Sequence, residues 1–255
     1  MTMTILPVGG PTAVLELGGL RLVTDPTFDP PGDYPIGDHV LTKLAPPAVD
    51  AAGIGAVDAV LLSHDQHPDN LDHAGRALLG TVPLVLSTTA AAGRVPGVTA
   101  LRPWQYRDLG PVRITAVPAL HGPPGTEHLT GEVIGFVLTG AGLPTVYVSG
   151  DNASLDVVRE IATRFPRIDV ALLFGGAVRT PPIGDAQFTL GAAAMTEATR
   201  ILGARHVVPL HIEGWTHFTE GPADVEAAFT KAALADRLHL PTPGRPIALP
   251  PPDVR

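Results

Sequence analysis

The sequence contains no cysteine among its 255 residues. This absence excludes disulfide frameworks, iron–sulfur clusters, zinc sites built on thiolates and thiol nucleophiles. Histidine and carboxylate side chains are the other common ligands of a catalytic metal ion, and the chain has ten histidines. The composition therefore favours a metal site made only of nitrogen and oxygen ligands.

Positive charge is also scarce, since 17 Lys and Arg residues stand against 25 Asp and Glu residues, for a net charge of −8. A nucleic-acid interface needs a basic face, so we expect no nucleic-acid partner. No apolar run is long enough to span a bilayer and no signal peptide is visible, so a cytoplasmic protein without a membrane span is the default expectation. The sequence leaves the oligomeric state open, a homo-oligomer included.

Short apolar runs separated by Gly and Pro predict many strands and a few helices. The runs at 12–17 and 20–24 flank Gly18 and Gly19, which is typical of a β-hairpin. Residues 26–46 are rich in Pro, Gly and Asp and predict a long loop, and the Pro-rich tail from 240 is expected to cross the surface. Further strands are predicted at 59–62, 83–87, 112–117, 132–138, 145–149, 169–174 and 206–210, and helices at 47–55, 153–165, 190–202 and 223–237. No linker divides the chain, so residues 1–255 are expected to form one domain.

The apolar run at 59–62 leads directly into a segment rich in histidine and aspartate. His64, His67 and Asp69 fall within six residues, which is a spacing typical of metal ligands. The alternative is a solvated polar loop whose histidines have no shared role.

Three later residues have the same placement at the end of an apolar strand. His121, Asp151 and His211 follow the runs 114–120, 146–150 and 206–210. Strand ends meet at one edge of an α/β sheet, so we expect these side chains to join the first group at one site. Any one of them alone would more simply be a hydrogen-bonded structural residue.

The order of these residues resembles that of the metallo-β-lactamase superfamily. The matching positions are the metal loop, the mid-chain histidine, the bridging aspartate and the late histidine, in chain order His64 to Asp69, His121, Asp151 and His211.

The opening segment, 9–26, is similar to the branch that contains L-ascorbate-6-phosphate lactonase and the phospholipase D acting on N-acylphosphatidylethanolamines. The resemblance covers about residues 5–220. It implies an α/β protein of the four-layer αββα sandwich type with one or two divalent metal ions at the sheet edge. Zinc is favoured, with manganese and iron as alternatives.

The metal loop departs from the superfamily pattern His-x-His-x-Asp-His by one extra residue, with Gln66 and Asn70 at positions where that pattern has histidine. The arrangement that best fits the loop uses His64, His67 and Asp69. Asn70 offers only a neutral carbonyl oxygen, a poor zinc ligand. The second metal position is then expected to hold Asp69, Asp151 and His211, without a further protein nitrogen.

These features predict a metal-dependent hydrolase that uses a metal-bound hydroxide on an ester, lactone or phosphodiester of a small molecule. Asp69 is expected to bind metal and orient the hydroxide, and His217 to donate a proton or bind substrate. Arg179 is either a contact for an anionic substrate or a surface charge, and the segment 122–128 of loop 122–131 is expected to close over the site. The alternatives are an iron-dependent oxidoreductase on the same fold and a non-catalytic protein that binds metal or a small molecule.

Overall fold

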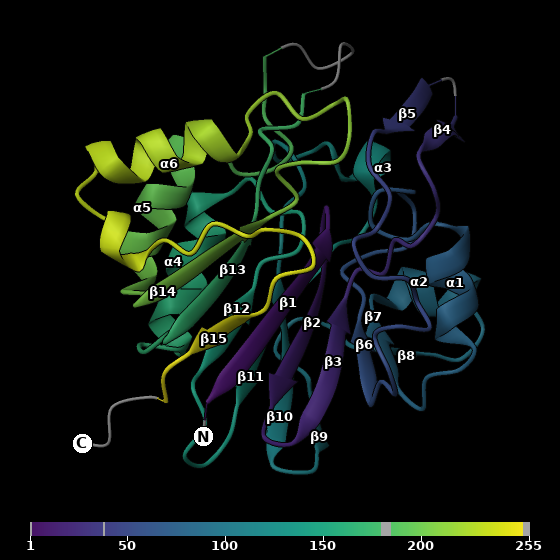
Figure 1. The fold of residues 1–255 in the computed structure, drawn as a ribbon, viewed down its shortest axis with the longest axis horizontal. Helices are drawn as coiled ribbons and strands as arrows, with labels where there is room; N and C mark the ends of the chain where they lie inside the picture. The colour runs from purple at the N-terminus through teal and green to yellow at the C-terminus, as the bar shows by residue number, and fades with distance from the viewer. Residues whose placement is uncertain (1, 38, 180–184, 252–255) are drawn as a thin grey trace.

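The computed structural model describes residues 2–37, 39–179 and 185–251, and it shows two β-sheets packed face to face between two layers of helices (Figure 1). The first sheet has the strand order β15 (Ile247–Leu249), β1 (Met3–Gly9), β2 (Thr12–Leu17), β3 (Leu20–Thr24), β6 (Ala59–Leu61), β7 (Val85–Ser87) and β8 (Val98–Ala100). The second has the order β14 (His206–Leu210), β13 (Val170–Phe174), β12 (Val146–Val148), β11 (Ile134–Thr139), β10 (Val112–Pro118) and β9 (Tyr106–Leu109).

Three apolar clusters define the layers. The first lies between the two sheets. The second lies between the outer face of the second sheet and the helices α4 (Leu155–Arg164), α5 (Ala192–Leu202) and α6 (Pro222–Lys231). The third covers the outer face of the first sheet under α1 (His73–Leu79) and α2 (Thr89–Arg94). This is the predicted αββα sandwich.

The central strands read as nearly continuous apolar runs because both faces of each sheet are covered, whereas the edge strands β8 and β9 are largely exposed. In β2, Leu15 packs between the sheets while its neighbour Val14 packs under the outer helices. In β13, Leu172 faces the other sheet while Leu173 faces α4 and α5. Successive side chains point to opposite faces of a strand, so burial on both faces requires apolar residues throughout.

The structure corrects three sequence-based predictions. Within the expected loop 26–46, β4 (Gly32–Ile36) and β5 (His39–Lys43) form a separate two-stranded sheet. No helix forms at 47–55, where Gly55 takes a φ of 74° that an α-helix does not allow. The proline-rich tail contributes β15, which pairs with β1 so that Ile247 lies opposite Ile5.

The remaining elements are short and lie at the two ends of the sandwich. The helix α3 (Glu127–Thr130) lies within loop 122–131, close to the β4–β5 hairpin (Figure 1). A 3₁₀ helix, Ala235–Arg237, follows α6. Among the residues that the structure describes, no helix is long and apolar enough to cross a membrane.

Candidate metal centre

The metal loop begins where β6 ends, and a buried aspartate from the first sheet fixes its start. Asp25, which follows β3, accepts hydrogen bonds from the backbone N–H and the hydroxyl of Ser63, both at 2.6 Å. β6 lies parallel to β3 and β7, so the chain leaves the sheet at its carboxyl edge. His64 therefore enters the site from a rigid position.

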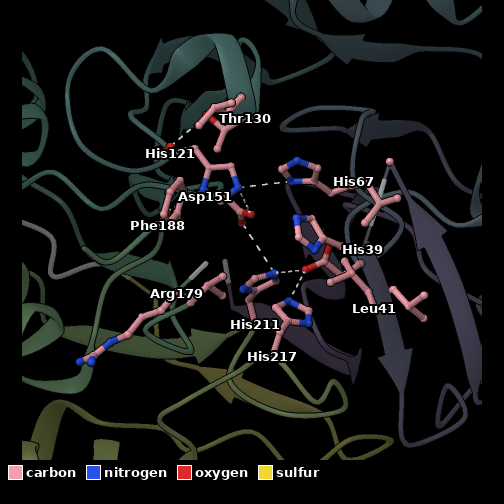
Figure 2. Close-up of a pocket in the computed structure, with 16 residues that line it drawn as sticks. His39, Leu41, His67, His121, Thr130, Asp151, Arg179, Phe188, His211 and His217 are labelled. Atoms are coloured by element: carbon pink, nitrogen blue, oxygen red, sulfur yellow. Dashed lines mark hydrogen bonds and ion pairs between the residues drawn. The ribbon is translucent and has the colours of Figure 1, made fainter. Parts of the chain in front are cut away.

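Four residues form the first cluster, and Figure 2 labels three of them, His67, His121 and Asp151. His64 Nε2 lies 2.9 Å from His67 Nδ1, and His121 Nε2 lies 3.3 Å from the same atom. Asp151 Oδ2 is 3.5 Å from His121 Nε2 and 4.0 Å from His64 Nε2. These ligand atoms converge within 4.8 Å of one another, as the ligands of one metal ion do.

A second cluster lies beside the first and is formed by Asp69, His211 and His217. Asp69 Oδ2 is 3.1 Å from His211 Nε2 and 2.9 Å from His217 Nε2. Asp151 lies between the clusters, because its other oxygen, Oδ1, is 3.9 Å from His211 Nε2. One carboxylate thus faces both groups, which is the bridging position expected from the sequence.

Hydrogen bonds on the far side of three rings orient the imidazoles. His121 Nδ1 donates to the carbonyl of Phe188 at 2.6 Å, and His211 Nδ1 donates to the carbonyl of Gly175 at 3.1 Å. His64 Nδ1 lies 2.9 Å from the Ser63 hydroxyl, which itself donates to Asp25. A proton on Nδ1 leaves the lone pair of Nε2 directed into the cluster, as in proteins whose histidines bind metal.

The charges of the two clusters also suit a cation. Burial lowers the pKa of His64, and it lowers the pKa of His67 to about 4, so both rings are neutral at pH 7 and have lone pairs to offer. Burial opposes ionisation of Asp69, but His217 and His211 hold its pKa well below the usual range. Two buried carboxylates beside neutral imidazoles require positive charge.

His211 carries that positive charge when no metal is bound. Burial opposes its protonation, yet the carboxylates of Asp151 and Asp69 raise its pKa to about 9. Within the described residues, the buried atoms Asp69 Oδ1 and His217 Nδ1 have no hydrogen-bond partner. A group that supplies positive charge and accepts an oxygen ligand would satisfy this site, so the residues fit divalent metal ions.

Asn70 occupies a structural position between carboxylates. Its amide nitrogen donates to Asp25 at 3.1 Å and to Asp151 Oδ1 at 3.2 Å. The sequence analysis expected no further protein nitrogen at the second cluster. The structure places one there, from His217, which lies 148 residues from Asp69 in the chain. The sequence signal was the close spacing of His211 and His217, which the prediction read as a catalytic rather than a ligand position.

The extra residue of the metal loop is accommodated on the side away from the clusters. Asp65 directs its carboxylate to the guanidinium of Arg94, with two hydrogen bonds, and its backbone carbonyl accepts from Arg76. Gln66 folds back so that its side-chain oxygen accepts from the backbone of Asp65 at 3.2 Å. Neither Asp65 nor Gln66 belongs to a metal-ligand cluster, whereas His64 and His67 both belong to the first one. The extra residue therefore does not prevent the two histidines from meeting.

A cavity of about 500 Å³ opens above the clusters (Figure 2). Its floor carries residues of both clusters, and its walls come from the β4–β5 hairpin, α3 and the segments on either side of 180–184. Arg179 lies in the wall but pairs with the exposed carboxylate of Asp185 at 3.7 Å. Loop 122–131 contributes Leu129 and Thr130 to the wall, and these residues directly follow the segment 122–128 that was expected to close over the site.

The other histidines lie outside the two clusters. His39 lines the cavity mouth on the hairpin, and His73 contacts Asp29 at the start of α1. His206 and His239 form a separate pair, with 3.0 Å between Nδ1 and Nε2. His128 is exposed on α3 and contacts the carbonyl of Gly125.

Two relatives of this chain are named metal-dependent hydrolases. One from Pelotomaculum thermopropionicum is 32% identical over 143 residues, which are 54% of this chain and 58% of that protein. The match thus spans less than two thirds of the Pelotomaculum protein. Another from Myxococcus xanthus is 28% identical over 215 residues, which are 78% of this chain and 71% of that protein.

Solved structures share the fold over nearly the whole chain. A protein from Veillonella parvula, described as a possible metal-dependent hydrolase, has a TM-score of 0.85 and 17% identity, covering 98% of this chain and 100% of that one. An isothiocyanate hydrolase from Delia radicum gut bacteria has a TM-score of 0.81 and 21% identity, covering 97% of this chain and 98% of that one. At these identities the likeness shows the αββα fold alone.

The family model for the β-lactamase superfamily domain matches residues 20–212. That range covers most of the chain and contains the metal loop, His121, Asp151 and His211. The nearer resemblance to the lactonase and phospholipase branch stays a prediction. The match and the geometry of the two clusters together establish that the chain belongs to the metallo-β-lactamase superfamily.

Proposed function

We propose that this protein is a hydrolase that binds two divalent metal ions and cleaves an ester, a lactone or a phosphodiester of a small molecule. The observation that carries the proposal is the placement of Asp151 between the two ligand clusters, with one oxygen facing each. A single carboxylate shared by two clusters is the arrangement of binuclear hydrolytic sites. The two relatives described above are named metal-dependent hydrolases, and these names support the same reaction class.

The two clusters would hold one ion each. The first offers His64, His67, His121 and Asp151, and the second offers Asp69, His211 and His217 with the other oxygen of Asp151. Divalent ions at these positions would supply a water of lowered pKa and would polarise the bond to be cleaved. Because every donor is nitrogen or oxygen, zinc suits the site, and manganese and iron share the same ligand preferences.

Asp69 is the residue we assign to the attacking water. Its Oδ2 lies in the second cluster, while Oδ1 is buried and has no hydrogen-bond partner among the described residues. A carboxylate with one oxygen committed and one free can accept a hydrogen bond from water and orient it toward substrate in the cavity. His217 lies at the open side of the same cluster, and we assign it as a metal ligand in place of its predicted role as proton donor.

The test combines metal analysis with turnover. Protein purified without added metal is analysed by plasma mass spectrometry and assayed on a panel of esters, lactones, phosphodiesters and an isothiocyanate. We expect about two zinc or manganese ions per chain and turnover of at least one class. His121→Ala should reduce kcat/KM by roughly 100-fold or more, because a ligand is lost. His128→Ala, which removes an exposed histidine, should retain both metal and turnover.

Two other results would each support one of the alternative functions instead of the hydrolase. Stoichiometric iron without hydrolysis would favour the oxygen-activating oxidoreductase on the same ligands. Failure to bind any metal after supplementation would exclude both metal-dependent reactions and leave a protein that binds small molecules without catalysis.

A further inference from the structure

The wall of the cavity above the metal centre is apolar, although it is built from three separate parts of the chain. The β4–β5 hairpin, the short helix α3 and the two segments around 180–184 meet there (Figure 2). Their apolar contributions are, in chain order, Ile36, Val40, Leu41, Leu129, Val178 and Phe188. Convergence of apolar side chains around a small cavity is the usual form of a small-molecule binding site.

Two of these side chains are exposed to solvent at the cavity mouth. Val40 on β5 and Leu129 on α3 are each 55% exposed. Among the described residues only four large apolar side chains are this exposed, and these two line the same cavity. Exposed apolar groups gathered around one opening mark a surface that is covered when a ligand binds.

The cavity wall contains few cationic groups that could bind an anionic part of a substrate. Of the described side chains that line the cavity, only Arg179 has a permanent positive charge, and its guanidinium lies 3.7 Å from the carboxylate of Asp185. Figure 2 shows its side chain extending away from the two clusters. Recognition of a phosphate group normally uses several cationic or N–H donors directed at it.

The hairpin that carries half of the apolar wall is held firmly at its base. Lys43, at the end of β5, is buried, and its ammonium lies 3.2 Å from Asp72 and 3.3 Å from the carbonyl of Thr27. The next residue, Leu44, donates its N–H to the carbonyl of Gly214. These contacts hold the base of the hairpin, close in sequence to Val40 and Leu41.

We propose that this wall binds an uncharged aliphatic or aryl group of the substrate, and that the enzyme therefore prefers esters or lactones with such a group to phosphodiesters. The proposal rests on the hydrolase function proposed above. The cavity volume of about 500 Å³ suits a group of medium size. Substrate bound in this way would place its polar reacting group on the floor, next to Asp69, Asp151 and the histidines.

The first experiment measures binding and does not depend on hydrolysis. The neutral apolar dye N-phenyl-1-naphthylamine is titrated into the metal-loaded protein and followed by fluorescence. Val40→Asp and Leu129→Asp should each raise the Kd by roughly tenfold or more, because a charge then lies where an apolar group binds. Both positions are exposed, so the variants should fold. The matched control is Leu44→Asp, which is equally exposed at 59% but lies outside the cavity wall.

The second experiment measures specificity on p-nitrophenyl esters from acetate to octanoate. We expect kcat/KM to rise about threefold to fourfold per added methylene until the cavity is filled. The rise should disappear in Val40→Asp and persist in Leu44→Asp. Bis-p-nitrophenyl phosphate should be turned over more slowly than the best ester.

The outcomes separate this proposal from the proposed function. Dye binding that is weakened only by the cavity substitutions, with no ester, lactone or phosphodiester turned over, would retain the apolar binding site and contradict the hydrolase. Ester hydrolysis that is independent of chain length, or dye binding that Val40→Asp and Leu44→Asp weaken equally, would overturn the apolar site and leave the hydrolase in place.

Discussion

Asn70 and His217 both contact the two ligand clusters in ways that the sequence did not predict. The amide nitrogen of Asn70 donates hydrogen bonds to Asp25 and to Asp151, and so holds the Asp151 carboxylate in position between the two clusters. His217 brings a ring nitrogen to within 2.9 Å of Asp69, at the second cluster. The second cluster therefore has two imidazoles, one more than the sequence led us to expect.

His217→Ala tests this assignment. The variant should lose the ion of the second cluster and keep that of the first, because His64, His67 and His121 are untouched. Bound zinc, measured by plasma mass spectrometry after dialysis, should fall from about two ions per chain to about one. The control His128→Ala should keep both ions. Two tightly bound ions in His217→Ala would show that this histidine is not a ligand.

Arg94→Ala tests the support of the extra loop residue. The Asp65 side chain is only 3% exposed, whereas Arg94 is 46% exposed, so the charge left unpaired would be the buried one. We expect the free energy of unfolding in urea to fall by about 1–3 kcal/mol, the range for a lost hydrogen bond to a charged group. Affinity for metal should fall as well, because Asp65 adjoins His64.

The matched control is Arg113→Ala. Arg113 makes the same two-bond contact with Asp108, at 2.8 and 3.0 Å, but both partners are exposed. The decrease in the free energy of unfolding should be clearly smaller in Arg113→Ala than in Arg94→Ala, since solvent screens exposed ion pairs. Equal losses in the two variants would contradict a special role for Asp65 in the loop.

At the scale of elements, the sequence predicted β2, β3, β6, β7 and the strands from β10 to β14 as apolar runs, whereas β1, β8, β9 and β15 were not predicted. The hairpin of β2 and β3 was predicted from Gly18 and Gly19, and both glycines have the positive φ that a tight turn needs, 62° and 82°. The hairpin of β4 and β5 was missed for a physical reason. It belongs to neither large sheet, it is half exposed, and its Pro35 and Gly37 are residues typical of loops.

The tail is a second element that the sequence did not predict. The residue that precedes it, His239, docks on β14: its N–H donates to the carbonyl of Val207, and its ring lies 3.0 Å from the His206 ring. Burial lowers the pKa of both rings. Arg205 lowers that of His206 further and Asp169 opposes this, while His206 itself lowers the pKa of His239.

The pair predicts a dependence of stability on pH. In the unfolded chain both histidines would take up protons near pH 6.5, whereas the folded chain resists protonation until lower pH. The unfolded state therefore binds more protons in that window, and stability should fall as the pH is lowered from about 7 toward 5. His239→Gln should show a smaller decrease of Tm over this range than the unmodified protein. The exposed His128→Gln is the control, and an unchanged pH dependence in His239→Gln would contradict the role of the pair.

At the scale of the whole molecule, the sequence pointed to most residues of the candidate site but not to how they divide between the two clusters. Strand ends in the sequence identified His64, His121, Asp151 and His211, because an apolar run followed by a polar residue marks the edge of a sheet. Which of these share an ion depends on how the two sheets pack, and no local pattern carries that information. The same holds for His217, whose contact with Asp69 joins residues 148 positions apart.

The two clusters also connect the two sheets. His64, His67 and Asp69 follow β6 in the first sheet, whereas His121, Asp151 and His211 follow β10, β12 and β14 in the second. An ion in either cluster would therefore link the layers at the edge of the sandwich. Without it, two buried carboxylates depend on the histidines around them for positive charge, and His211, whose pKa is raised to about 9, supplies it at neutral pH.

Removal of metal should therefore lower the stability of the whole molecule and not merely its activity. An ion that binds only the folded state adds about 2.7 kcal/mol at a free concentration 100 times its Kd, so Tm should fall by several degrees on chelation and rise again with added zinc. Differential scanning fluorimetry measures both changes. Asp151→Asn, which weakens the carboxylate shared by the two clusters, should abolish most of the zinc-dependent rise, whereas His128→Ala should retain it. A Tm that chelation does not change, or a full zinc response in Asp151→Asn, would show that the ions do not link the sheets.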